Sequence, residues 1–332
     1  MKKLMGLGSC FAVLFCFVTA FGSIFAAGSA VHATKAPRKI AVLTSKGGNG
    51  HMAACAVLKD IFPNSKITLF NPIYDEFHNV FDGEDLYVKL FQNGWIRTLN
   101  IVAGYVGPTY FKMNSRSIKK SIVKYLEQEK PDILISVIPL LNFPAYEAAQ
   151  QCKTPFMNIT LDADLTLWLL DMERCKTHNF VITVQAKTPL IKKQLARHKV
   201  PASCVREVGC SLRKDFFEKK DIQAIKKEWN IPTGKKVILL MRGGTGSTKL
   251  VDYVEAISEL DKPLHLLVCI GKNTKLIKEL EEVRKELQHN KKNKKILRLR
   301  LFHLLKKYQI LWLFQMCLLH NQVLIRVTKR FI

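Results

Sequence analysis

The chain has 332 residues, of which 48% are hydrophobic, and a formal net charge of +25 at pH 7. This length allows two domains of ordinary size, and the apolar fraction is that of a globular protein. Eleven Lys and Arg lie in residues 291–330, and no RNA-binding signature or zinc-finger spacing accompanies the basic excess. We therefore expect an anionic membrane surface as a partner and no nucleic acid.

Residues 4–33 are apolar apart from small polar residues and follow Lys2 and Lys3. This pattern predicts a secretory signal peptide or an uncleaved membrane anchor over residues 1–34. Positive residues flank both ends, so charge does not decide the orientation.

A short apolar run at 40–43 leads into a glycine-rich turn, and helical spacing follows over 52–60. Backbone N–H groups at such a helix N-terminus favour a phosphate or a developing anion. The turn, GGNGH, matches neither a P-loop nor G-x-G-x-x-G. His51 ends the turn, where it could act as a general base or only hydrogen-bond the turn.

Strand and helix patterns alternate along the rest of the chain. In the first half we predict strands at 66–70, 133–137, 155–159 and 180–184 and a helix at 118–130. A second alternation begins near residue 221, and its strands at 237–241 and 265–270 run into RGGTGS and GKN. The pattern predicts an α/β fold with two similar domains and ligands at the carboxyl ends of parallel strands.

Residues 81–111 interrupt this alternation with many aromatic and few charged residues. One interpretation is a lipid-facing or acceptor-binding flap, with Arg97 and Lys112 available for phosphate head groups. The other is a buried helical pair.

Six collinear segments resemble the monogalactosyldiacylglycerol synthase and processive diacylglycerol glucosyltransferase family, which is related to the MurG enzyme of peptidoglycan synthesis. They are SKGGNGHMAA at the first loop, KPDILISVIPLLN at 130–142, TPFMNITLD at 154–162, VREVGCSLRKDFF at 205–217, ILLMRGGTGS at 238–247 and VCIGKN at 268–273. The resemblance implies GT-B architecture, with two Rossmann-like domains built on parallel sheets, and transfer of a hexose from UDP-glucose or UDP-galactose to diacylglycerol.

The resemblance also implies roles for particular residues. His51 corresponds to the loop histidine near the acceptor hydroxyl and is the candidate base. No metal or cofactor is needed beyond the UDP-sugar itself, because backbone amides at helix N-termini can stabilise the leaving diphosphate. The implied donor-binding residues are Gly243, Gly244, Gly246, Ser247, Gly271 and Asn273, and the acceptor-binding residues are Gly48, Gly50, Trp95 and Arg97.

One departure concerns the segment after Asp162, where many relatives have His-Pro-x-Trp and this chain has DLTLW. Asp162 and Asp164 are therefore alternative candidates for the base or its orienting group. Helix capping is the competing interpretation of both carboxylates.

The last part of the chain departs from the family pattern. No Asp or Glu follows Glu286, and the donor-binding segment expected after GKN is replaced by a lysine-rich sequence. One choice of codons for residues 308–332, read in a shifted frame, encodes VSDFMAVSDVFITQSGSDSCNEAIY, which contains the missing motif. A basic amphipathic tail that binds membrane is the alternative interpretation.

We accordingly predict an N-terminal acceptor-binding domain over 39–217, a partial nucleotide-sugar-binding domain over 221–290, truncated by a frameshifted tail over 291–332, and impaired activity. The catalytic domain is expected on the cytoplasmic face of a membrane, although the N-terminal segment would allow export. Two alternatives remain: a MurG-like transferase acting on a polyprenyl-linked sugar, and an exported two-lobe binding protein without enzymatic activity.

Overall fold

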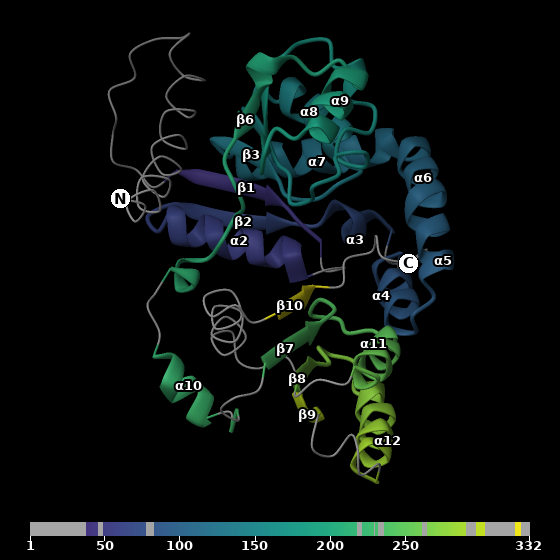
Figure 1. The fold of residues 1–332 in the computed structure, drawn as a ribbon. Coiled ribbons are helices and arrows are strands. Elements are labelled where there is room, and N and C mark those ends of the chain that lie inside the picture. The colour runs from purple at the N-terminus through teal and green to yellow at the C-terminus, as the bar shows by residue number, and fades with distance from the viewer. Residues whose placement is uncertain are drawn as a thin grey trace. The chain divides into compact units, whose positions relative to one another are not determined.

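The computed structural model describes residues 38–45, 49–77, 83–217, 221–228, 230–231, 236–260, 264–289, 297–302 and 323–326 (Figure 1). The predicted signal peptide or anchor and Gly48 lie outside these residues. Most of the predicted tail also lies outside them.

The first sheet has six parallel strands in the order β2-β1-β3-β4-β5-β6. Most of these strands are short runs of apolar residues, and β3, β4 and β5 are buried along their whole length, as expected for parallel strands covered on both faces. The strands are β1 (Lys39–Leu43), β2 (Lys66–Phe70), β3 (Ile133–Ser136), β4 (Phe156–Ile159), β5 (Phe180–Val184) and β6 (Val205–Glu207).

Helices alternate with these strands, which confirms the predicted α/β pattern. In α7 the buried residues Ile118, Ile122 and Leu126 recur every four positions, and the helix ends where Lys130 takes a left-handed conformation before Pro131. The helices are α2 (Asn49–Ile61), α3 (Pro72–Phe77), α7 (Ser115–Glu129), α8 (Asn142–Gln151) and α9 (Pro189–Arg197). The first of them begins three residues earlier than predicted, so His51 lies within its first turn.

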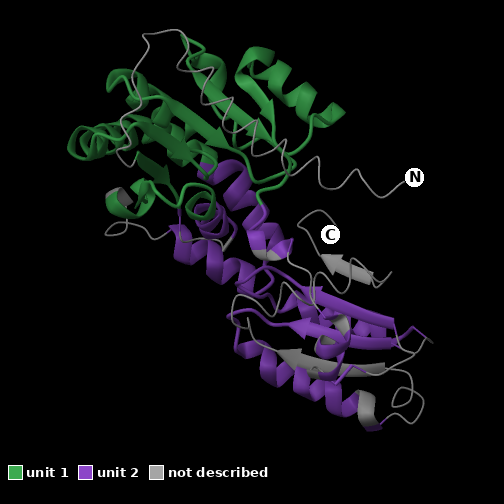
Figure 2. Ribbon diagram, turned by 90° about the vertical axis from the view of Figure 1, so that its left-hand side faces the viewer, with its two compact units in different colours: residues 1–44, 58–76, 108–211 green, residues 45–57, 77–107, 212–332 purple. Residues whose placement is uncertain are grey.

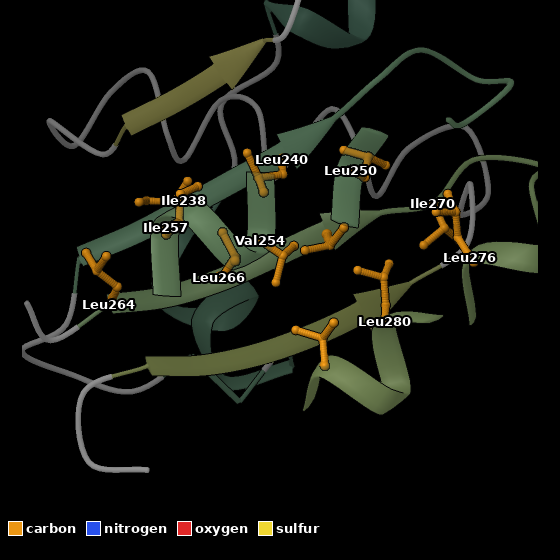
Figure 3. Close-up of a cluster of buried hydrophobic side chains, with 12 residues drawn as sticks. Ile238, Leu240, Leu250, Val254, Ile257, Leu264, Leu266, Ile270, Leu276 and Leu280 are labelled. Atoms are coloured by element: carbon orange, nitrogen blue, oxygen red, sulfur yellow. The ribbon is translucent and has the colours of Figure 1, made fainter. Parts of the chain in front are cut away.

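The second sheet has four parallel strands in the order β10-β7-β8-β9. Side chains of β7 and β8 pack against α11 and α12 in one buried apolar cluster, which includes Leu240, Val254, Leu266 and Leu280 (Figure 3). The elements are α10 (Ile222–Glu228), β7 (Lys236–Met241), α11 (Lys249–Ser258), β8 (Leu264–Cys269), α12 (Lys275–His289), β9 (Leu297–Phe302) and β10 (Val323–Arg326).

The aromatic segment is helical. It forms α4 (Gly83–Gln92), α5 (Ile96–Ile101), a π-helical turn (Val102–Val106) and α6 (Gly107–Met113). Leu90, Ile96 and Leu99 form a small buried cluster, whereas the side chains of Trp95 and Tyr105 are 61% and 75% exposed. One face of the segment is thus a packed helical pair, and contact of the exposed aromatic residues with a lipid stays a prediction.

The described residues fall into two compact units that do not follow chain order (Figure 2). Unit 1 comprises residues 1–44, 58–76 and 108–211, and unit 2 comprises residues 45–57, 77–107 and 212–332, as far as these ranges are described. Helices α4 and α5 therefore group with the second sheet.

The predicted fold class, α/β with two Rossmann-like parallel sheets, is confirmed. Strands β9 and β10 come from the segment that we assigned to a frameshifted tail. A run of apolar residues can form a paired strand whichever reading frame encoded it. The presence of β9 and β10 therefore does not test the frameshift. The predicted frameshift and the functional domain map thus stay predictions.

Candidate functional site

Two glycine-containing loops lie at the carboxyl ends of the neighbouring strands β7 and β8. Residues 242–248 connect β7 to α11, and residues 270–274 connect β8 to α12. The backbone N–H of Lys272 donates a 2.9 Å hydrogen bond to the carbonyl oxygen of Gly244, so the two loops are joined directly. This is the edge at which open parallel sheets bind ligands.

Glycine is required where the loops meet. Gly246 has φ +74°, and a Cβ there would lie 1.9 Å from the carbonyl oxygen of Ile270. Gly271 has φ +64°, and its Cβ would lie 2.6 Å from the carbonyl oxygen of Gly244. Any side chain at either position would thus collide with backbone atoms of the opposite loop.

The two loops place helix N-termini at the same edge of the sheet. Helices α11 and α12 begin at Lys249 and Lys275, immediately after the loops. The positive end of the helix dipole favours an anion at such positions. The N–H groups of Leu250, Val251, Leu276 and Ile277 already donate to carbonyl oxygens of the two loops. At Gly243, which is exposed, a Cβ would meet nothing within 4 Å, so the approach to this part of the first loop is open.

Arg242 is the functional candidate that sequence reasoning missed. Its side chain is 2% exposed, and neither terminal nitrogen has a hydrogen-bond partner within the part of the chain that the structure describes. Its Cζ lies 5.1 Å from the centroid of the Phe91 ring. Burial lowers the pKa of Arg242, yet a guanidinium still carries its charge at neutral pH. A buried cation in this state provides a strong electrostatic attraction for an anion.

Ser247 and Asn273 are the buried polar residues of the two loops. The hydroxyl of Ser247 is fully buried and has no hydrogen-bond partner among the described residues. Asn273 is 3% exposed, and its Nδ2 donates a 3.2 Å hydrogen bond to the carbonyl oxygen of Gln92 on α4. The structure thus brings the six predicted donor-binding residues together, and their roles stay predictions.

The predicted acceptor-side residues that the structure describes also belong to unit 2. His51 is half-buried in the first turn of α2, next to the exposed Gly50. Trp95 precedes α5, and Arg97 is an exposed residue of that helix. A catalytic role for His51 stays a prediction.

Asp162 and Asp164 lie in unit 1 and accept local hydrogen bonds. The indole Nε1 of the buried Trp168 donates to Asp162 Oδ2 over 2.9 Å. Asp164 Oδ1 accepts from the backbone N–H of Thr166 and from Gln194 Nε2 over 3.0 and 2.6 Å. These bonds favour a turn-stabilising role for Asp164, while Asp162 is an exposed residue with one such bond.

No group of three or more His, Cys, Asp and Glu side chains within the described ranges could hold a metal ion. Within the same ranges no helix has the length and apolar character needed to span a membrane. The apolar segment at 4–33 lies outside these ranges.

Comparison with known proteins identifies relatives in sequence and in fold. A processive diacylglycerol β-glucosyltransferase of Bacillus licheniformis is 24% identical over 261 residues, which cover 74% of this chain and 64% of that protein. The enzyme with the same name from Bacillus subtilis is 25% identical over 264 residues, which cover 75% of this chain and 65% of that protein. The chain therefore spans slightly less than two thirds of the length of these relatives.

A sucrose-phosphate synthase from Thermosynechococcus elongatus has a similar structure, with a TM-score of 0.50 and 10% identity over 84% of this chain and 73% of that one. This likeness concerns the fold alone. No protein-family model matches the chain. The sequence relatives confirm the resemblance to the diacylglycerol glucosyltransferases that the motifs predicted.

Proposed function

We propose that this chain, a relative of the processive diacylglycerol β-glucosyltransferases, is a glycosyltransferase that moves a hexose from a UDP-sugar to diacylglycerol. The observation that carries the proposal is the pair of joined glycine loops beside the buried Arg242, whose terminal nitrogens have no hydrogen-bond partner among the described residues. Such a site suits the diphosphate of a nucleotide-sugar, because its charge would pair with the guanidinium.

On the donor side, the diphosphate lies against the two loops, where Gly243, Gly244, Gly246, Ser247, Gly271 and Asn273 are the proposed contacts. Charge builds up on the diphosphate as its bond to the sugar breaks. Fixed donors and a buried cation stabilise this charge most strongly in the transition state, which lowers the barrier.

On the acceptor side, the hydroxyl oxygen of diacylglycerol attacks the anomeric carbon, and the bond from that carbon to UDP breaks. His51 takes the hydroxyl proton, and UDP leaves with the bonding electron pair. Gly48, Gly50, Trp95 and Arg97 are the proposed acceptor contacts. Asp162 is the alternative base.

The proposed location is the cytoplasmic face of a membrane, where UDP-sugars are available and the basic surface of the chain meets anionic lipid. Residues 291–332 are proposed to be a frameshifted tail that replaces part of the donor-binding domain. The chain as it stands is then expected to have low activity. Sequencing of the gene across the lysine run tests this point, and an unshifted frame with no family motif downstream would contradict it.

The test of function uses the full chain beside a version in which the reading frame is restored from residue 291. Each is incubated with UDP-glucose or UDP-galactose and diacylglycerol, and the lipid products are separated. We expect a glycosyldiacylglycerol from the restored chain. No glycosyldiacylglycerol, together with extension of a polyprenyl-linked sugar, would indicate the MurG-like reaction instead. A cleaved periplasmic chain inactive with every UDP-sugar would indicate an exported binding protein.

The role of His51 is tested in the restored chain. His51→Ala should lower turnover by about a hundredfold or more, which is the usual contribution of a general base. The matched control is His289→Ala, because His289 is exposed near the end of α12. Full activity of His51→Ala would remove His51 from the mechanism, and Asp162→Asn would then test the alternative base.

A further inference from the structure

The last turn of α4 is attached to both glycine loops through one residue, Gln92. Its carbonyl oxygen accepts hydrogen bonds from the backbone N–H of Thr248 over 2.9 Å and from Asn273 Nδ2 over 3.2 Å. Its side-chain Nε2 donates to the carbonyl oxygen of Thr245 over 3.3 Å. Gln92 is thus bonded to the first loop twice and to the second loop once.

The chain just after Gln92 is fixed by a helix-ending motif. Gly94 has φ +71°, its N–H donates to the carbonyl oxygen of Phe91, and the N–H of Trp95 donates to that of Leu90. This pairing is a Schellman motif, in which glycine supplies the left-handed residue. The turn therefore ends in one defined conformation.

The same turn packs closely against the beginning of α11. A Cβ at Gly94 would lie 2.8 Å from Thr248 Oγ1 and 3.2 Å from Lys249 Cγ. One residue before Gln92, the Phe91 ring faces the guanidinium of Arg242. Residues of α4 thus contact the first loop at both of its ends, Phe91 at Arg242 and Gln92 at Thr248. Every predicted donor contact of that loop lies between these two loop ends.

We propose that Gln92 is a positioning residue for the donor site, which holds the two glycine loops in the arrangement that binds a diphosphate. The inference rests on the proposed function for the identity of the ligand. Its geometric basis, the bonds from α4 to the loops, is independent of that function. Gln92 lies in the aromatic segment that sequence analysis connected with the acceptor, whereas its contacts assign its last helical turn to the donor side.

A purely structural role would give a different result from a positioning role. If Gln92 only contributed to packing, its replacement would lower global stability and leave ligand affinity unchanged once the protein is folded. If Gln92 positions the loops, affinity for UDP falls in the folded protein. The amide of Thr248, which donates to the Gln92 carbonyl, then also exchanges its hydrogen faster.

The test is Gln92→Met in the full chain, because methionine keeps the length of the side chain and removes the donor to Thr245. Gln223→Met is the matched control, since Gln223 is an exposed helical glutamine of the same unit. We expect UDP affinity, measured by calorimetry, to fall about three- to tenfold in the first variant, the size of one hydrogen bond, and to be unchanged in the control. Hydrogen exchange at Thr248 should be faster only in the first variant.

A second pair of variants tests the same contact by crowding it. Gly94→Ala should weaken UDP binding further, because its Cβ would collide with Thr248 Oγ1. Adding Thr248→Ala removes that oxygen and should restore part of the lost affinity, although the strained φ angle at residue 94 remains. Absence of any restoration would contradict direct contact between the turn and the loop.

Failure of the inference is distinguishable from failure of the proposed function. If neither the unmodified chain nor the frame-restored chain binds UDP, the proposed donor is wrong, and exchange at Thr248 alone then decides the role of Gln92. If only the frame-restored chain binds UDP, Gln92→Met and its control are compared in that chain. If the unmodified chain binds UDP and Gln92→Met binds it equally well, the inference is overturned, whatever the exchange rate at Thr248.

Discussion

Replacing the buried arginine is the most decisive experiment on the candidate site. Arg242 is 2% exposed, and its terminal nitrogens have no partner in the described part of the chain. Removing an ion from water without a partner costs several kcal/mol. The contact with the Phe91 ring offsets about 0.5–2 kcal/mol of this cost, and the Asp252 carboxylate offsets a further part. The arginine should therefore destabilise the ligand-free protein.

Arg242→Met replaces the charge with a flexible apolar side chain that can fill the same space. We expect the free energy of unfolding of the ligand-free protein to rise by about 1–4 kcal/mol, as in other replacements of buried ions by apolar residues. Urea unfolding at pH 7 measures this change. The control Arg116→Met removes an exposed arginine of α7 and should change stability by less than about 0.5 kcal/mol.

The same variant should lose its response to ligand. UDP at about a hundred times its dissociation constant should stabilise the unmodified chain by about 2.7 kcal/mol, whereas uridine, which has no phosphate, should stabilise both proteins equally. In Arg242→Met the additional effect of the diphosphate should largely disappear. A variant that is less stable than the original and still responds fully to UDP would identify Arg242 as a structural residue without a role in binding the diphosphate.

Three further predictions concern a loop, a thiol and an ion pair. Gly246→Ala should lower the free energy of unfolding by more than about 2 kcal/mol in urea titrations, because its Cβ would overlap a backbone oxygen. Burial raises the pKa of Cys175 to about 12, so iodoacetamide should label the exposed Cys210 at pH 7.5 well before Cys175, as mass spectrometry can show. Burial acts to raise the pKa of Glu173, but the hydrogen bond with His198, a backbone hydrogen bond and the charges of His198 and Lys112 together outweigh it and leave that pKa below its usual value. Glu173→Gln should therefore cost less than about 1 kcal/mol of stability at pH 6, after screening by solvent, and in pH-dependent unfolding the difference should disappear as the pH falls through the lowered pKa of Glu173.

The strands were predictable because their signal is local. The run at 40–43 is apolar at every position, and a buried parallel strand requires this pattern whatever its neighbours are. The end of α7 could also be predicted, because Pro131 excludes the helical conformation for the residue before it. The start of α2 was less certain, because glycine and histidine in GGNGH are compatible with either a turn or a first helical turn.

The partners of the loop at 242–248 could not be predicted from the sequence. RGGTGS indicates a loop after a strand, and a charged residue directly after an apolar run could have marked Arg242. Nothing in these letters indicates that the guanidinium is buried against Phe91. Gln92 and Thr245 are 153 residues apart, and no local pattern relates them.

The α/β class, the two glycine loops and the resemblance to diacylglycerol glucosyltransferases could be read from the amino-acid sequence, because short-range periodicity and motif order are properties of the chain. The three-dimensional fold was needed to show that Gly246 and Gly271 lie against backbone atoms of the opposite loop, that Arg242 is a buried cation, and that α4 is bonded to the loop beside it. These features depend on which distant segments become neighbours, and the packing of the whole unit fixes that choice.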